Sequence, residues 1–202
     1  MNGIVLSVDD ERRLVGVAEA AIRAVLERGV VELPSPADVP ARLTRPAATF
    51  VTLERDGDLL GCIGSLEPRR PLVVDVAHNA IAAAFADPRM PPLTPSDFAA
   101  MDVKISILTA PEPLAVASYD VAVAALEPGT DGVLVEAGRH RATLLPSVWR
   151  HVDGAETFMA ALWRKAGLFP GMWPRGTRVS VYRAHEVHDR GPRRAVDVAA
   201  AG

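Results

Sequence analysis

Two stretches with the sequence signature of a β-hairpin constrain the fold of this chain more than any other feature. The first has β-favouring residues from Phe50 to Leu53, an Asp56-Gly57 turn, and a second strand running from Leu59 towards Ser65. The second covers residues 133–146 and bends at residues 138–140. Hairpins pair strands that are neighbours in sequence, so they argue against the regular strand-helix alternation of a Rossmann fold.

Helical patterns lie between and around these hairpins. Helices are predicted at residues 7–27, 71–86, 119–126 and 153–167, and single strands at 103–109 and 178–183. Gly29 ends the first helix, and Asp153 with Glu156 forms a capping-box pattern at the start of the last. We therefore predict an α+β fold of two lobes, each with a small hairpin-based mixed or antiparallel sheet flanked by helices.

The charge balance excludes several classes of partner. The chain carries 22 basic and 25 acidic residues, a formal charge of −3. It therefore lacks the basic surface that favours binding to nucleic acid or to anionic membranes. The sequence begins without a basic leader, and no apolar stretch reaches the roughly 18 residues that span a bilayer. We expect a cytoplasmic protein with no nucleic-acid or membrane partner.

Cys62 is the one cysteine in the sequence, which excludes an internal disulfide and a cysteine-rich zinc site. It lies between Gly61 and Gly64 at the end of the first hairpin, and these glycines permit a bulge or the close approach of a backbone or a ligand. Strand alternation places Leu60 and Cys62 on one face and Ile63 on the other. Two interpretations stay open: a buried small hydrophobe, or a thiol activated by groups elsewhere in the fold.

Other polar residues could contribute to a site. His78 shares a helix face with Asp75 and Asn79, which indicates either a solvent-exposed face or a cluster that faces a cleft. Arg89 lies in a proline-rich loop, where it could anchor an anion or pair with Asp87. Each of these residues therefore has a structural interpretation beside the functional one.

Motifs that would identify a cofactor are missing from the sequence. It lacks the H-E-x-x-H pattern of zinc enzymes, the G-x-S-x-G pattern of hydrolases and a phosphate-binding loop. The cofactor, if the protein uses one, is therefore unknown from the sequence. Of the 22 basic residues only Lys104 and Lys165 are lysine. We interpret that excess of arginine as coding bias, so arginine abundance carries little functional weight.

Several segments, in order, resemble the AMMECR domain family. They are FVTLERDGDLLGCIGSLEP, NAIAAAFADPRMPPLT, ISILT, GVLVEAGRHRATLLPSVW and LWRKAGL. In bacteria and archaea the domain resembles protein A of the AmmeMemoRadiSam system. The resemblance covers about residues 9–186, and we predict a single domain over 9–188 followed by a flexible tail over 189–202.

The family's L-R-G-C-I-G motif falls on residues 59–64, and this chain departs from it with Leu60 in place of the arginine. Since Leu60 and Cys62 are predicted to share a strand face, the departure removes the cation best placed to attract an anion or stabilise a thiolate there. The family's D-P-R-F element falls on residues 87–90, with Met90 in place of the aromatic residue. The L-P-x-V element falls on residues 145–148 and matches.

The resemblance implies a cleft between two lobes and a binding or scaffold role in a modification or radical-chemistry pathway. The implied partners are a Memo-like protein and a radical S-adenosylmethionine enzyme. The residues expected around the cleft are Cys62, Leu60, Gly61, Ile63, Gly64, Asn79, Asp87 and Arg89. The alternative is an enzyme that uses Cys62 as nucleophile or redox thiol, with His78 as base and Arg89 as anion anchor.

Overall fold

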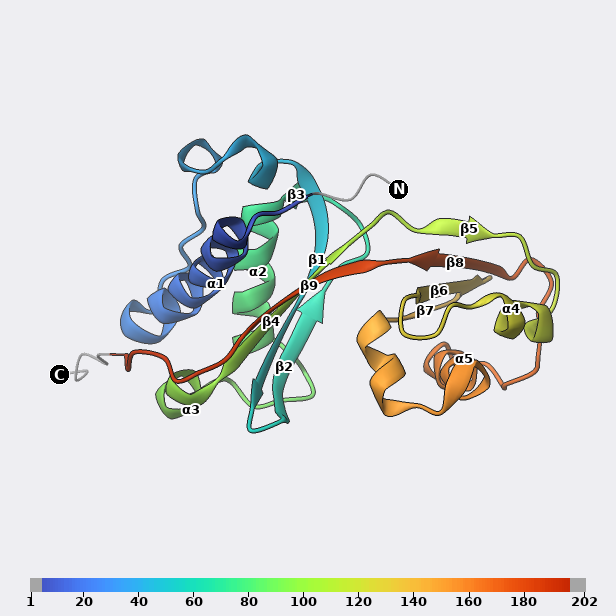
Figure 1. Cartoon of the computed structure of the whole chain (residues 1–202). Helices are drawn as coiled ribbons and strands as arrows, with labels where there is room; N and C mark the ends of the chain where they lie inside the picture. Colours follow the sequence, from blue (N-terminus) through green and yellow to red (C-terminus); the bar gives the residue numbers. More distant parts are fainter. Residues whose placement is uncertain (1–4, 197–202) are drawn as a thin grey trace. The chain divides into compact units, whose positions relative to one another are not determined.

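The structure is a computed structural model that describes residues 5–196. The chain forms two compact units, one containing the residues up to Leu108 and from His185 onward, the other Thr109–Ala184 (Figure 1). Each unit carries its own antiparallel sheet with helices packed on it. The predicted α+β class, built on hairpins, is therefore confirmed.

The first unit holds a five-stranded sheet with strand order β2-β1-β4-β9, in which β3 pairs with β1. Its elements are α1 (Val8–Arg28), β1 (Pro46–Arg55), β2 (Asp58–Gly64), β3 (Arg70–Pro71), α2 (Leu72–Phe85), α3 (Pro95–Ala100), β4 (Asp102–Leu108) and β9 (Ala184–Asp189), with short 3₁₀ turns at Pro36–Asp38 and Ala41–Leu43. The predicted first hairpin is β1 and β2, joined at Asp56 and Gly57.

The second unit holds a four-stranded sheet with strand order β5-β8-β6-β7. Its elements are β5 (Glu112–Leu114), α4 (Tyr119–Ala125), β6 (Gly132–Ala137), β7 (His140–Leu144), a 3₁₀ turn at Pro146–His151, α5 (Gly154–Lys165) and β8 (Arg178–Tyr182). The predicted second hairpin is β6 and β7.

Local sequence determines both ends of α1. The Ser7 side chain accepts a hydrogen bond from the backbone N–H of Asp10, and the Asp10 carboxylate accepts one from the backbone N–H of Ser7, which completes a capping box. At the other end Gly29 adopts a φ of 67°, and its N–H donates to the carbonyl of Val25. The predicted helix over residues 7–27 is therefore confirmed.

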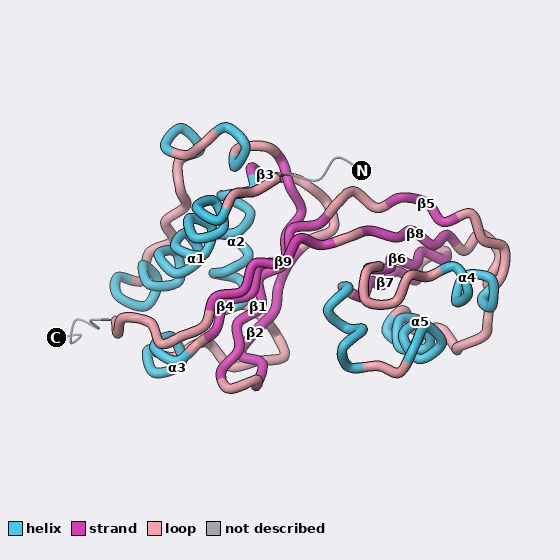
Figure 2. Tube along the Cα trace, in the orientation of Figure 1, coloured by secondary structure: helices cyan, strands magenta, loops and turns pink. Residues whose placement is uncertain are grey.

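The core of the first unit lies between one face of its sheet and the helices. α2 packs against β1 and β2, and α1 packs against α2 (Figures 1 and 2). Val51 and Leu53 alternate along β1 and are fully buried on this face. The other face of the sheet carries Thr52 and Glu54 of β1, which are partly exposed.

The second unit has a separate aromatic core. Trp163 of α5 is fully buried, and its indole N–H donates to the carbonyl of Met172 at 2.8 Å. Trp173 stacks on Trp163 with ring centroids 5.8 Å apart. Trp173 therefore packs against this core.

The capping box predicted for α5 is wrong. Asp153 precedes the helix, but its side chain makes no capping hydrogen bond. The first helical residue, Gly154, has a φ of 79°, far from the value near −60° of a regular helix start. The residue types at positions 153 and 156 therefore fit a capping box, but the backbone at the start of α5 does not have the geometry that a capping box requires.

The chain continues in ordered contacts beyond the boundary expected at residue 189. The backbone N–H of Gly191 donates to Asp102 at 2.9 Å, and that of Arg193 donates to the carbonyl of Ala99 at 2.8 Å. The Arg193 guanidinium also pairs with Asp189 and Glu19. The contacts of the predicted tail with the first unit thus extend through its described part, and residues 197–202 lie outside the described residues.

None of the helices within residues 5–196 is long and apolar enough to cross a bilayer.

We predict that Asp10→Asn lowers the free energy of unfolding by about 2 kcal/mol near neutral pH, because a buried charge-assisted contact is lost. The Asp10 carboxylate is buried and accepts from the Arg42 guanidinium at 2.5 Å. That contact, with those from Ser7, lowers the pKa of Asp10 well below its usual range despite burial. Urea denaturation across a pH series measures the loss.

The sign of the pH dependence follows from the lowered pKa. Stability from Asp10 is present above its unfolded pKa and declines as the pH falls towards its folded pKa. The difference between wild type and Asp10→Asn therefore narrows in acid. Asp9→Asn is the control, because Asp9 is exposed in the same turn and its loss changes stability by less than about 0.5 kcal/mol. A difference that does not vary with pH would contradict the prediction.

Candidate functional site

Cys62 lies in β2, which forms one edge of the five-stranded sheet. It is half-buried and stands opposite Thr52 of β1, whose hydroxyl donates to the Cys62 sulfur at 3.1 Å. Thr52 in turn stands opposite Lys104 of β4. Cys62, Thr52 and Lys104 thus form a row across the sheet on the face opposite the helices, which we call the polar face together with Glu54 and Asp102.

A β-bulge interrupts the pairing of β2 with β1 just before Cys62. Leu53 pairs with Gly61 and Glu54 with Leu59, so Leu60 is the extra residue. The Leu60 side chain packs against the apolar core. The predicted shared face of Leu60 and Cys62 is therefore wrong, because a bulge breaks the two-residue alternation of a strand. Residue 60 therefore does not determine the charge beside the thiol, because the two side chains lie on different faces of the sheet.

The two glycines around Cys62 are required by close approaches within the protein. A Cβ at Gly61 would collide with the carbonyl oxygen of Ala83 in α2. A Cβ at Gly64 would collide with the Phe50 ring and with the carbonyl oxygen of Thr49. The structure thus fills both spaces with its own backbone and side chains, which accounts for these glycines without a ligand.

Ile63 completes the motif on the core side. It pairs with Val51, which is fully buried, and packs against the same apolar cluster. Its role in the structure is therefore packing.

Asp87 and Arg89 hold the backbone of Cys62 at the open edge of β2. The Asp87 carboxylate accepts the backbone N–H of Cys62 at 2.9 Å, and the Arg89 guanidinium donates to the Cys62 carbonyl at 3.0 Å. The two side chains also pair with each other at 2.7 Å and 2.9 Å. Together they satisfy one donor and one acceptor that an edge strand otherwise leaves unpaired.

This arrangement shifts the pKa values of both side chains. The hydrogen bonds from Arg89, followed by the one from the Cys62 backbone, lower the pKa of the buried Asp87 well below its usual range. The hydrogen bond to Asp87 raises the pKa of Arg89, and the Cys62 side chain adds to that rise. Asp87 therefore remains ionised and Arg89 charged at neutral pH.

Asn79 and Asp75 belong to a buried network on the helix side of the sheet. The Asp75 carboxylate accepts from the backbone N–H and the hydroxyl of Thr49 at 3.1 Å and 2.7 Å. The Asn79 amide donates to the Thr49 hydroxyl at 2.9 Å and to Asp75 at 3.0 Å. Of the two interpretations left open for this helix face, the solvent-exposed one is wrong for Asp75 and Asn79, which are buried. The network instead fixes α2 on β1.

His78 is the exposed member of that helix face, and it is placed away from the thiol. Its Nε2 lies 3.4 Å from the Arg70 guanidinium. α2 packs on the core face of the sheet, whereas the Cys62 side chain lies on the polar face with Thr52. The structure does not bring the expected base and the expected nucleophile together.

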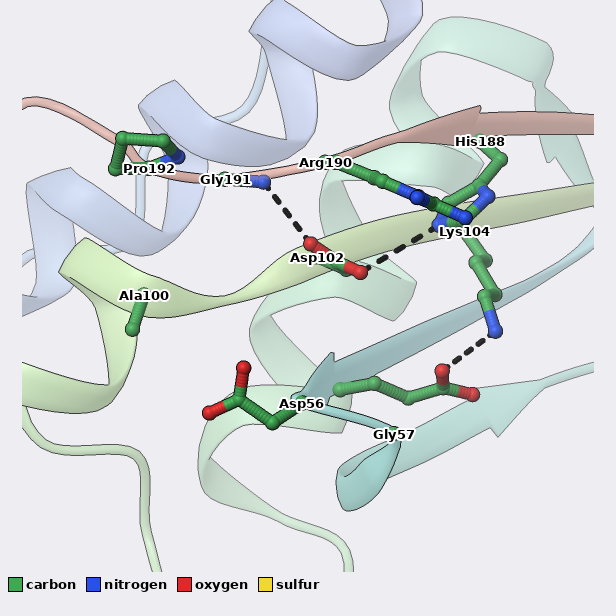
Figure 3. A pocket seen from close by; sticks show the side chains of 10 residues that line it. Asp56, Gly57, Ala100, Asp102, Lys104, His188, Arg190, Gly191 and Pro192 are labelled. Atoms are coloured by element: carbon green, nitrogen blue, oxygen red, sulfur yellow. Dashed lines mark hydrogen bonds and ion pairs between the residues drawn. The ribbon is translucent and has the colours of Figure 1, made fainter.

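Sequence reasoning missed a pocket at one end of the polar face, with a volume of about 630 Å³ (Figure 3). Its lining residues are Glu54, Asp56, Gly57, Ala100, Asp102, Lys104, His188, Arg190, Gly191 and Pro192. The Lys104 ammonium pairs with Glu54 at 2.5 Å. The one signal in the sequence was that Lys104 is among only two lysines in an arginine-rich chain.

A metal centre finds no support in the described residues. Within residues 5–196, no group of three or more His, Cys, Asp or Glu side chains is arranged to hold a metal ion.

Comparisons with known proteins give a consistent relationship. The family model AMMECR1 matches residues 15–187. A protein of Methanothermobacter thermautotrophicus is 41% identical over 188 residues, covering 92% of this chain and 97% of its own. The crystal structure of an uncharacterized protein from Pyrococcus horikoshii is similar at a TM-score of 0.82 and 31% identity, covering 93% of this chain and 99% of its own. The names of these proteins state no activity.

We predict that Gly61→Ala lowers the free energy of unfolding of the first unit by about 2 kcal/mol, since the added methyl forces β2 away from Ala83. Gly16→Ala is the matched control. Gly16 lies in α1 with open space around its Cα, so the same change raises stability by about 1 kcal/mol through helix propensity. Urea denaturation measures both changes. Equal effects of the two substitutions would contradict the close approach at Gly61.

Proposed function

Because this chain belongs to the AMMECR1 family, we propose that it acts as a binding component that presents the polar face around Cys62 to a protein partner. The observation that carries the proposal is that the backbone and side-chain polar groups of Cys62 are all held by hydrogen bonds within the protein. Its N–H and carbonyl are taken by Asp87 and Arg89, and its sulfur accepts from Thr52. Such contacts hold a surface in one shape, which reduces the entropy lost on binding.

The charged residues of the polar face favour a protein partner of mixed charge over a partner with a large charge of one sign. The polar face carries two acids, Glu54 and Asp102, and one cation, Lys104, so its net charge is small. Protein interfaces of this kind combine hydrogen bonds with matched charges, which give specificity more than affinity. The family resemblance leads us to propose a Memo-like protein and a radical S-adenosylmethionine enzyme as the partners.

One observation favours the alternative, an enzyme that uses Cys62. The thiol is half-buried, and the Arg89 guanidinium donates to the carbonyl of Cys62 itself at 3.0 Å, which places a cation in the neighbourhood of the only thiol. The position of His78 on the other side of the sheet leaves that enzyme without its expected base, so binding is the better-supported function.

We predict that the tagged chain co-purifies with at least one of these two partners when they are expressed together. Thr52→Arg places a bulky charge in the centre of the polar face and weakens retention at least about tenfold, as expected for a central interface position. Arg13→Glu is the control, because Arg13 is exposed on α1, away from this face. Quantitative pull-down measures retention, and melting temperatures verify that each variant is folded.

Cys62→Ser separates the two functions in the same experiment. A binding role predicts that this variant retains its partner, since a serine hydroxyl still accepts a hydrogen bond from Thr52. Retention that depends on the thiol itself would favour covalent chemistry at Cys62. Retention of neither protein by the wild type would contradict the proposed partners, and full retention by folded Thr52→Arg would contradict the proposed surface.

A further inference from the structure

The pocket at the end of the polar face shares Glu54, Asp102 and Lys104 with the proposed partner surface, and it adds Asp56 and Arg190, which the proposed partner binding does not use. It is formed where the β1–β2 turn, the start of β4 and the segment after β9 meet (Figure 3). Its volume of about 630 Å³ lies in the range of small-molecule sites. It therefore has room for a metabolite-sized ligand.

Most charged groups in the pocket are already paired. Lys104 pairs with Glu54. Asp102 accepts the Gly191 N–H at 2.9 Å, and the His188 ring lies 3.7 Å from its other oxygen. These contacts fix the walls of the pocket. Because the paired side chains already neutralise one another, they offer little net charge to a ligand.

Two opposite charges in the pocket are left over. Among the described residues, the side chains of Arg190 and Asp56 have no hydrogen bond or ion pair, and both residues are exposed. In Figure 3 the Arg190 side chain extends towards His188, whereas Asp56 lies on the other side of the pocket, below Ala100. Asp56 is held there by the hairpin turn, with a φ of 52°.

The overall charge of the lining selects between ligand classes. The pocket contains three acids, Glu54, Asp56 and Asp102, against the two permanent cations Lys104 and Arg190. A polyanion such as a nucleotide would face a net negative lining and is disfavoured. A ligand with one anionic and one cationic group would instead match both unpaired side chains.

We propose that this pocket binds a small zwitterion such as a short peptide, whose C-terminal carboxylate contacts Arg190 and whose N-terminal ammonium group contacts Asp56. A guanidinium is suited to a carboxylate because it can donate two parallel hydrogen bonds to it. Arg190 and Asp56 lie outside the polar face as defined above, so the two ligand contacts do not depend on the protein partners.

The test is an NMR titration of the ¹⁵N-labelled full chain with L-alanyl-L-alanine and a panel of free L-amino acids. We expect saturable shifts at the amides of Gly57, Lys104 and Gly191 for at least one zwitterion. Acetate and methylammonium each carry half of the recognition and bind at least about tenfold more weakly, the loss expected when one ion pair is missing.

Arg190→Gln and Asp56→Asn each weaken the zwitterion by at least about tenfold. Both side chains are exposed, so the variants retain the fold, which the unchanged remainder of the spectrum verifies. Arg175→Gln and Asp38→Asn are exposed controls outside the pocket and leave binding unchanged. The proposal is overturned if no zwitterion shifts the pocket amides, if acetate binds as tightly as the zwitterions, or if the pocket variants bind normally.

Discussion

The carboxylate of Asp87 stands at the point where the edge of the first sheet would otherwise be open. It is buried, it accepts the backbone N–H of Cys62, and it orients Arg89 so that the guanidinium reaches the Cys62 carbonyl. An edge strand with free backbone groups invites pairing with other chains, and this local pair occupies that position. The shape of β2, and with it the setting of the thiol, depends on this interaction.

Much of the fold could be predicted because its signals are local. The Asp56-Gly57 turn identified the first hairpin, and Gly29 marked the end of α1. The division of the last strand region into β8 and β9 could not be predicted, since two short strands that join different sheets differ only in their partners. The contacts of residues 190–196 were missed for the same reason. They depend on Asp102 and Glu19, which are distant in sequence.

The site shows the same limit in sharper form. The sequence pointed to Cys62 and to the pairing of Asp87 with Arg89, which are two residues apart. It could not reveal the bulge at Leu60, because pairing register is a property of two strands and not of one. Nor could it show that Asp75 and Asn79 are buried, because both need Thr49 of β1 to satisfy their hydrogen bonds. Polar residues on a helix are read as exposed unless such a partner is known.

Amide hydrogen exchange at Cys62 tests most directly whether Asp87 holds this edge. The Cys62 N–H donates to Asp87 at 2.9 Å, so we predict that this amide is protected in the wild type although it lies on an edge strand. In Asp87→Ala its exchange accelerates by at least about tenfold, while amides of the central strand β1 change much less. Unprotected exchange at Cys62 in the wild type, or protection that survives in Asp87→Ala, would contradict the account.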